Sequence, residues 1–311
     1  MTEIATIIIT YNHAVSIGAT LRSLFHGSRV PSQVFCLDNA SKDRTAEIVA
    51  NHRSITLARN DCNIGFSGGC NRGIQATDAP FVFFLNPDVV LAPDCLSLLH
   101  DALASAPPDV AAVFPKLLRP VRDNRPAVID STGIAMHHNG LVPADRGFGE
   151  IDRQQYDRTE PFGPSGACML FRRDALARLS VAGEIFDEDF FAYYEDVDLA
   201  WRARNFGYRF HYLPAAAATH DRKNPGYYTS SLQGRADVNR LFCVLKNHRA
   251  PIGLLPQMVA ANGPRLLWHS LAKPGYSAAI SHLWRNYPRM LYKRRLVMGK
   301  ATAPEALSDF L

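Results

Sequence analysis

The stretch Phe81 to Leu91, Phe-Val-Phe-Phe-Leu-Asn-Pro-Asp-Val-Val-Leu, decides how the rest of the chain is interpreted. Its first five residues are apolar and rich in aromatics, which predicts a short strand buried on both faces of a mostly parallel sheet. Pro87 has no N–H to donate to a neighbouring strand, so the strand is expected to end there. Asn86 and Asp88 then follow its carboxyl end, where open α/β sheets bind ligands. A carboxylate there suits a cation that also binds phosphate, and a plain polar turn is the alternative.

Composition indicates a globular chain with an uneven distribution of charge. Its 311 residues suffice for one large domain, or one domain with a tail, and 47% hydrophobic residues is ordinary for such a protein. Of the 34 Lys and Arg residues, 11 lie between positions 238 and 304, where there is no Asp or Glu. A mildly acidic body is therefore expected to carry a basic C-terminal region.

Cysteine usage and the lack of targeting patterns favour a cytoplasmic protein. The six cysteines form no C-x-x-C pair, and several lie in apolar runs where a free thiol packs as a small hydrophobe. The N-terminus lacks the pattern of a signal peptide, and no apolar run approaches the ~20 residues of a spanning helix. Any membrane contact is expected to be peripheral.

Strand and helix patterns alternate over the first part of the chain. Strands are expected at 4–10, 34–37 and 55–58, with helices from Ser16 to Leu24 and over 45–51 between them. Such a βαβαβ unit binds a mononucleotide at its strand ends. The run from Asn63 to Gly73 follows, and its four glycines are expected where backbone approaches a ligand closely. Further elements are expected at 70–76 (helix), from 92 or 93 to 104 (helix) and at 110–115 (strand).

The second half begins with a stretch rich in loops, at 118–156, where substrate-specific elements often lie. Strands are expected at 167–171 and 208–213, and Asp174 is expected to cap a helix between them. The C-terminal region is expected to form helical pieces separated by prolines, with Pro288 kinking or breaking one of them.

Seven carboxylates lie between Glu184 and Asp198, interleaved with five aromatic residues. Such clustering is unusual for a merely solvated face. Asp198 and Arg202 stand four residues apart on a predicted helix, which indicates a structural ion pair.

Together these stretches resemble the family 2 glycosyltransferases of the GT-A fold, especially the rhamnosyltransferase-like branch that acts on bacterial surface polysaccharides. The resemblance covers roughly residues 4 to 220 and rests on motifs at 10–12 (Thr-Tyr-Asn), 38–43 (Asp-Asn-Ala-Ser-Lys-Asp), 63–73, 85–88 (Leu-Asn-Pro-Asp), 186–202 and His220. It implies an α/β fold with a Rossmann-like, nucleotide-binding mixed sheet flanked by helices. A GT-A catalytic domain is expected at 1–225, with a nucleotide-sugar-binding half at 1–115 and an acceptor-binding half at 116–225, followed by a helical, basic C-terminal region at 226–311.

The resemblance also implies the residues that bind the donor. Tyr11 would stack on the base, and Asp38 or Asn39 would hydrogen-bond to its edge. The expected nucleotide-binding set is Thr10, Tyr11, Asn12, Asp38, Asn39, Ser41, Asn63, Gly65, Asn71 and Asn86.

Asp88 matches the second acid of the family's Asp-x-Asp metal motif, in which Mg²⁺ or Mn²⁺ bridges the protein and the diphosphate. The first acid of that motif is replaced by Asn86, as in the rhamnosyltransferase-like branch. His220 resembles the late histidine that completes the metal shell in several relatives, and a structural histidine is the alternative.

Glu195 and Asp196 match the family's Glu-Asp motif, whose carboxylate takes the proton of the acceptor hydroxyl. Inverting transfer is a single in-line displacement, which needs a base opposite the leaving nucleoside diphosphate and a cation to neutralise that group. Adjacent helical residues point about 100° apart, so only one of the two is expected to face the acceptor. We assign Asp196 as the base and Glu195 as a supporting residue or alternative base.

The predicted function is inverting, metal-dependent transfer of a sugar, with dTDP-rhamnose as the first candidate among dTDP- and UDP-sugars. The acceptor is expected to be a hydroxyl of a lipid-linked saccharide or growing cell-surface glycan. A nucleotidyltransferase, which would release pyrophosphate, and a catalytically silent nucleotide-sugar-binding module are the alternatives.

The tail from about residue 264 to 300 is expected to contact an anionic membrane through its basic residues and tryptophans, at the inner face of the cytoplasmic membrane. A hydrophobic face of this kind suits lipid better than nucleic acid, so no nucleic-acid partner is expected. The alternative is a helical cap on the catalytic domain or on a second subunit, which leaves the oligomeric state open.

Overall fold

The computed structural model describes residues 3–121, 126–137, 142–222, 230–250 and 276–302, together with positions 253, 256 and 268. Its strands are β1 (Ile4–Thr10), β2 (Gln33–Asp38), β3 (Thr56–Arg59), β4 (Phe81–Leu85), β5 (Val89–Leu91), β6 (Val110–Leu118), β7 (Ile129–Ser131), β8 (Ile134–His137), β9 (Val142–Asp145), β10 (Cys168–Arg172) and β11 (Arg209–His220). Its helices are α1 (Ile17–Phe25), α2 (Thr45–Ala50), α3 (Gly65–Gln75), α4 (Cys95–Ser105), α5 (Arg173–Arg178), the short η1 (Glu188–Phe190), α6 (Glu195–Asn205), α7 (Ser230–Asn247) and α9 (Ser277–Lys300).

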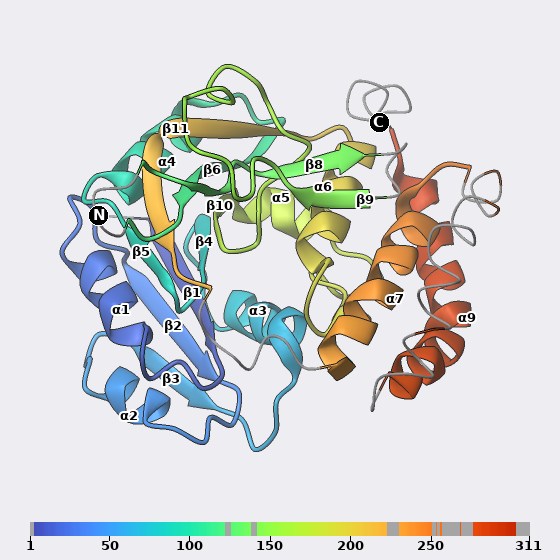
Figure 1. Ribbon diagram of the computed structural model, residues 1–311, viewed down its shortest axis with the longest axis horizontal. Coiled ribbons are helices and arrows are strands. Elements are labelled where there is room, and N and C mark those ends of the chain that lie inside the picture. Colours follow the sequence, from blue (N-terminus) through green and yellow to red (C-terminus); the bar gives the residue numbers. More distant parts are fainter. Residues whose placement is uncertain are drawn as a thin grey trace.

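One mixed sheet organises the described part of the chain (Figure 1). The strand order is β3-β2-β1-β4-β10-β6-β11-β5, with β7 paired to β6, while β8 and β9 form a separate hairpin. The strands β3, β2, β1 and β4 are mutually parallel, but β10 runs antiparallel between β4 and β6. The expectation of a mostly parallel sheet is therefore wrong for the centre of the sheet, whereas the predicted mixed sheet of the GT-A fold is confirmed.

The predicted strand at Phe81 is confirmed and lies at the centre of this sheet. Because side chains alternate across a strand, Phe81, Phe83 and Leu85 enter one hydrophobic core, while Val82 and Phe84 enter the other. Residues of α1 and α4 complete the first core, and residues of α3, α5, α6 and α7 complete the second. Burial on both faces explains why this strand reads as a continuous apolar run.

The glycine-rich run forms a helix rather than a ligand-binding loop over most of its length, which corrects the expectation for it. Helix α3 begins at Gly65, five residues before the predicted start. A Cβ at Gly73 would lie 2.5 Å from Ile7 Cγ2, and one at Gly69 would lie 2.9 Å from Ile9 Cδ1. These two glycines let α3 pack directly on β1, so their role is helix–sheet packing and not contact with a ligand.

Helix ends differ slightly from the sequence expectations. Asp174 lies within the first turn of α5, which begins at Arg173, so it does not occupy the N-cap position. Ser16 does occupy the N-cap position of α1, but its hydroxyl donates to the carbonyl of His13 instead of accepting from the helix.

The C-terminal helices α7 and α9 lie side by side at one edge of the molecule (Figure 1). Helix α9 continues through Pro288 over 24 residues, so of the two outcomes expected at this proline, a kink or a break, the break is wrong. Pro288 and Trp284 both lie on the exposed side of the helix, where water can bond to the carbonyl that the proline leaves without a donor. Within the described ranges, none of the helices combines the length and hydropathy needed to cross a membrane.

Candidate active site

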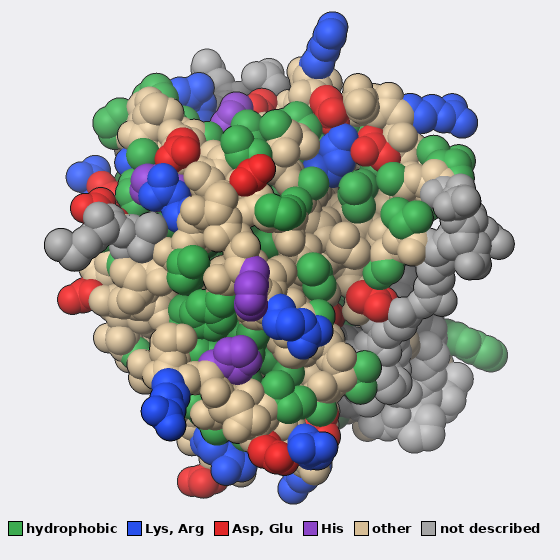
Figure 2. All heavy atoms as spheres, turned by 90° about the vertical axis from the view of Figure 1, so that its left-hand side faces the viewer, with side chains coloured by type: hydrophobic (Ala, Val, Ile, Leu, Met, Phe, Trp, Pro, Cys, Tyr) green, Lys and Arg blue, Asp and Glu red, His purple; other side chains and the backbone are tan. Residues whose placement is uncertain are grey.

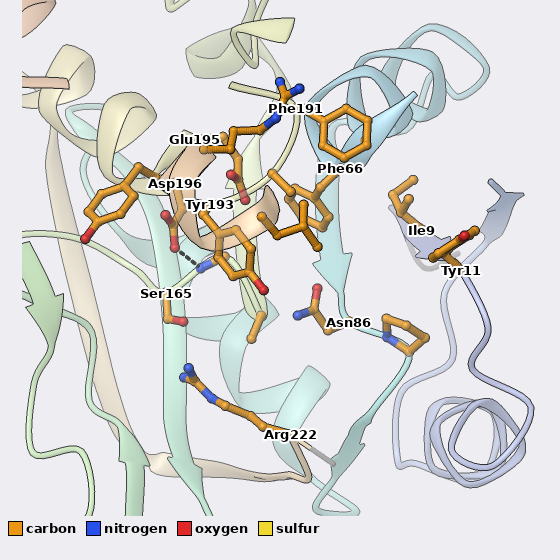
Figure 3. Close-up of a pocket in the computed structure, with 18 of the residues that line it drawn as sticks. Ile9, Tyr11, Phe66, Asn86, Ser165, Phe191, Tyr193, Glu195, Asp196 and Arg222 are labelled. Carbon is orange, nitrogen blue, oxygen red and sulfur yellow. Dashed lines mark hydrogen bonds between the residues drawn. The ribbon is translucent and has the colours of Figure 1, made fainter. Parts of the chain in front are cut away.

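A cavity of about 670 Å³ opens at the carboxyl ends of β1 and β4, within the size range of ligand pockets. One wall comes from the loops after β1, β2 and β4, and the facing wall comes from residues 191–197 at the start of α6. Figure 3 shows Tyr11 and Asn86 on one side of this space and Glu195 and Asp196 on another. The topology thus brings together sequence regions that lie more than a hundred residues apart.

Most of the predicted nucleotide-binding residues line this cavity. They are Thr10, Tyr11, Asn12, Asn39, Asn63, Gly65 and Asn86. The Tyr11 ring is 39% exposed, which leaves a face open for stacking. Asn39 donates to the carbonyl of Gly65 and accepts from Asn60, so its side chain also joins the β2 loop to the start of α3.

Asp38 and Ser41 lie behind the cavity wall and hold its shape. The Asp38 carboxylate is fully buried and accepts hydrogen bonds from the Thr10 hydroxyl at 3.2 Å and from the Ser41 N–H at 3.2 Å. The Ser41 hydroxyl accepts from the N–H of Asn12 at 2.9 Å. These contacts fix the loops that carry Tyr11 and Asn39.

Asn71 also lies outside the lining. Its side-chain amide donates to the Phe186 carbonyl at 2.8 Å and to Glu188, and its oxygen accepts from the Phe186 N–H at 2.9 Å. This pairing ties α3 to the acidic segment that precedes α6.

The two predicted metal ligands are neighbours beside the Asn86 wall of the cavity. His220, at the end of β11, places Nε2 3.3 Å from Asp88 Oδ1 and Nδ1 2.7 Å from Asp130 Oδ2. Burial alone would lower the pKa of His220, but its hydrogen bond to Asp130, the close approach of Asp88 and the charges of both carboxylates outweigh that effect and raise the pKa to about 9. Arg222 also contacts Asp130, so this carboxylate holds both His220 and Arg222 in place.

The chemistry of this pair fits a divalent cation. Asp88 Oδ1 is buried and accepts no well-aligned hydrogen bond from any described residue, although it lies at ion-pair distance from His220. Carboxylate oxygen and imidazole nitrogen are ligands that Mn²⁺ accepts. Among the described residues no group of three or more His, Cys, Asp and Glu side chains is placed to hold a metal, so the protein would supply two ligands and leave the others to substrate and water.

Both members of the acidic pair line the cavity (Figure 3), and the expectation that only one of them faces the acceptor stays a prediction. Asp196 Oδ2 accepts the Gly166 N–H at 2.8 Å, and burial raises the pKa of Asp196 although this hydrogen bond opposes the rise. Burial, followed by the charges of Asp196 and Asp198, raises the pKa of Glu195 well above its ordinary value. Glu195 Oε2 has no hydrogen-bond partner in the part of the chain that the structure describes.

The segment before the acidic pair has an unusual backbone. Phe191, Tyr193 and Tyr194 all have positive φ, at 64°, 71° and 69°, which is costly for aromatic residues. Asn239 of α7 is fully buried and donates to the carbonyls of Phe190, Ala192 and Tyr193 at 2.8 to 3.0 Å. A single side chain from the C-terminal region thus holds the strained wall of the cavity in place.

A buried ionic network anchors α7 and α9 below this segment. Lys246 Nζ lies 2.6 Å from Asp187 and 2.9 Å from Asp198, and Lys293 Nζ lies 2.5 Å from Asp187. Burial alone would raise the pKa of Asp187, but the two lysines outweigh it and hold the pKa well below its usual range. The predicted ion pair between Asp198 and Arg202 is confirmed, at 3.0 Å.

Several residues of the site were not predicted from the sequence. Gly166, Asp130, Arg222, Arg235 and Asn239 come from segments that the motifs did not single out. The spacing of Arg222, two residues after His220, was the one available signal, because alternate residues of an extended chain reach the same side.

We expect Glu195→Gln to change how stability depends on pH. The folded-state pKa of Glu195 lies above its ordinary value of 4.5, so the folded protein binds this proton more tightly than the unfolded chain does. The resulting stabilisation is complete below the ordinary value and is lost as pH rises through the folded-state pKa. Urea unfolding should therefore show the variant gaining stability relative to the parent protein as pH rises from acidic to mildly alkaline.

The exposed Glu3→Gln variant is the matched control, since it removes the same charge outside the cavity. A stability difference between Glu195→Gln and the parent that stays constant with pH would contradict the burial of an ionisable Glu195.

Comparison with known proteins agrees with the motifs. Residues 5–180, more than half of the chain, match the family model described as glycosyl transferase family 2. An N-acetylglucosaminyl-diphospho-decaprenol L-rhamnosyltransferase of Mycobacterium tuberculosis is 28% identical over 253 residues, covering 71% of this chain and 76% of that protein. A low-salt glycan biosynthesis hexosyltransferase of Haloferax volcanii is 24% identical over 208 residues, covering 65% of this chain and 62% of that protein.

Solved glycosyltransferases share the fold. GalNAc-T7, crystallised with UDP, GalNAc and Mn²⁺, aligns with a TM-score of 0.61 at 14% identity, over 78% of this chain and 47% of that one. The mannosyltransferase PcManGT of Pyrobaculum calidifontis, in complex with GDP-Man and Mn²⁺, aligns with a TM-score of 0.55 at 20% identity, over 96% of this chain and 86% of that one. The GT-A fold and the family predicted from the motifs are confirmed, and the chain belongs to glycosyl transferase family 2.

Proposed function

We propose that this glycosyltransferase is an inverting enzyme that moves rhamnose from dTDP-rhamnose to a hydroxyl of a lipid-linked or growing cell-surface glycan. The observation that carries the proposal is the cavity itself, which sets the buried Glu195 and the half-buried Asp196 of α6 opposite the exposed Tyr11 at the end of β1. The name of the mycobacterial relative, a rhamnosyltransferase acting on a lipid-linked sugar, supports the choice of donor and acceptor. We retain the division at residue 225 into catalytic and C-terminal regions as part of this proposal.

In this mechanism Asp196 accepts the proton of the acceptor hydroxyl as that oxygen attacks the anomeric carbon. The Gly166 N–H orients the Asp196 carboxylate, and the raised pKa makes it a stronger base than an ordinary aspartate. Glu195 holds its proton more tightly than an ordinary glutamate, because burial and the charges of Asp196 and Asp198 raise its pKa well above the ordinary value. The aromatic side chains of Phe66, Phe191 and Tyr193 line the same cavity and would exclude water from the activated sugar.

Asp88 and His220 are the residues that would hold Mg²⁺ or Mn²⁺. When bound, the cation would neutralise the charge that develops on the leaving nucleoside diphosphate. Mn²⁺ in two of the solved relatives supports this part of the proposal. Asp130 hydrogen-bonds to the other ring nitrogen of His220 and so fixes the orientation of the imidazole.

We also propose peripheral attachment to the inner face of the cytoplasmic membrane through α9. One face of α9 packs against the rest of the chain, as the cap alternative predicted, and uses Arg289, Lys293, Arg294 and Lys300 for internal contacts. The opposite face exposes Trp284 and Tyr292, at 71% and 54%, beside Arg285 and Arg295. By contrast, the face around α1 mixes acidic and basic side chains (Figure 2). Two predicted contributors, at positions 265 and 273, lie outside the described residues.

We expect Asp196→Asn to slow sugar transfer by roughly 10²- to 10⁴-fold while leaving donor affinity unchanged, the usual effect of losing a general base. Glu195→Gln should slow transfer less, because Glu195 is assigned a supporting role and Asp196 the role of the base. Initial rates with dTDP-rhamnose and donor titrations by calorimetry measure the two quantities. A larger loss in Glu195→Gln than in Asp196→Asn, with both variants folded, would reverse the two roles.

Asp88→Ala should abolish the increase in dTDP affinity that Mn²⁺ produces, since it removes one of two protein ligands. Nucleotide binding without metal should persist, because Asp88 does not line the part of the cavity around Tyr11. Calorimetric titration of dTDP with and without Mn²⁺ tests this, with the exposed Asp94→Ala as the matched control. An undiminished metal effect in Asp88→Ala would remove Asp88 from the metal site.

Reversing the two basic residues on the exposed face of α9, in the double variant Arg285→Glu, Arg295→Glu, should weaken binding to anionic vesicles by at least an order of magnitude. Each basic residue near an anionic leaflet is worth about 1 kcal/mol, and the attraction should weaken with salt. Co-sedimentation with anionic and zwitterionic vesicles measures it. The exposed Arg53→Glu, in the loop after α2, is the control, and equal or salt-insensitive binding by all proteins would refute membrane attachment through α9.

A further inference from the structure

Arg235 of α7 lines the cavity and has no acidic partner among the residues that the structure describes. Its guanidinium lies 4.9 Å from the centre of the Phe191 ring, and the side chain is half-buried. No carboxylate of the described residues forms an ion pair or hydrogen bond with it, and burial alone lowers the pKa of Arg235. Keeping a cation partly out of water without a compensating charge is unfavourable, so such a group is suited to an anion that arrives with a ligand.

The other arginine in the cavity wall is neutralised within the protein. Arg222 contacts Asp130 at 2.9 Å and Asp145 at 2.8 Å, so its charge is already shared between two carboxylates. Both arginines line the same cavity, so they differ in their ion pairs rather than in their access to a ligand. Arg235 is the one of these two whose charge is left for a ligand.

Arg235 lies on the acidic side of the cavity, away from the predicted metal site. It contacts Phe191, and Figure 3 shows Phe191 and Glu195 at the opposite end of the cavity from Arg222. Arg222 shares Asp130 with His220, so the Asp88–His220 pair lies at the Arg222 end. The diphosphate of a donor bound near Asp88 would therefore be remote from Arg235.

We propose that Arg235 binds a phosphate group of the acceptor, and that the acceptor is a saccharide whose first sugar is attached to a lipid through a phosphate or diphosphate. This rests on the proposed function, in which Asp196 takes a proton from that sugar's hydroxyl. A guanidinium presents two parallel N–H groups to two phosphate oxygens, which gives both strength and orientation. Anchoring the phosphate on the Phe191 side would hold the sugar against Asp196 and Glu195, which line the same wall.

The test compares two acceptors that differ only in the diphosphate group. One is a saccharide diphosphate with a short alkyl chain, and the other is the alkyl glycoside of the same sugar. We expect Arg235→Gln to raise the KM of the diphosphate acceptor roughly 10- to 100-fold, the effect of losing a charged hydrogen-bonding pair. The KM of the neutral acceptor, the KM of the donor and kcat should change little. Arg235→Lys should raise this KM by an intermediate amount, since lysine keeps the charge but lacks the two parallel N–H groups. The exposed Arg53→Gln is the matched control.

An equal rise in KM for both acceptors, or a rise in the KM of the donor, would overturn the assignment. Binding is measured separately by calorimetry, with dTDP and Mn²⁺ present to occupy the donor site, so that the result does not depend on turnover. Equal affinity of parent protein and Arg235→Gln for the saccharide diphosphate would also overturn it, as would free pyrophosphate binding as tightly as the saccharide diphosphate. Absence of transfer to either acceptor from any donor, with Arg235-dependent binding retained, would instead count against the proposed function.

Discussion

The buried contact of Asp187 with Lys246 and Lys293 is the interaction on which the catalytic side of the molecule depends. Each lysine comes from a different C-terminal helix, and both amines lie within 2.6 Å of the same carboxylate. Removing one partner from such a pair leaves a buried charge without compensation, which is strongly destabilising. Asp198 extends the network from Lys246 to Arg202 on α6. The C-terminal helices are therefore structural parts of the active site.

This anchoring explains how a strained segment can form one wall of the cavity. Three aromatic residues with positive φ precede Glu195, and Asn239 donates to the carbonyls of Phe190, Ala192 and Tyr193. The facing wall depends on the sheet, whose parallel strands end together near Tyr11 and Asn86. One rigid scaffold presents the wall that we propose for donor binding, and a second, fastened by ion pairs, presents Glu195 and Asp196. Fixing both walls before substrate arrives is what preorganised catalysis requires.

The sequence predicted best those features that depend on residues close together in the chain. The Phe81 strand, the position of Asn86 and the Asp198–Arg202 pair followed from periodicity and spacing alone. The motif resemblance placed Glu195 and Asp196 together in the cavity. The antiparallel insertion of β10 between β4 and β6 was not predictable, because strand order depends on pairings between residues that are distant in the chain. For the same reason, the sequence did not predict that Arg235 and Asn239 of α7 reach the site.

The most direct measurement of the central claim is the configuration of the newly formed glycosidic bond. The protein would be incubated with dTDP-rhamnose, Mn²⁺ and a saccharide acceptor, and the product examined by NMR at its anomeric centre while the released nucleotide is identified. A single displacement assisted by Asp196 predicts inversion relative to the donor, with release of dTDP. Retention of configuration, or release of pyrophosphate in place of dTDP, would contradict the proposed reaction.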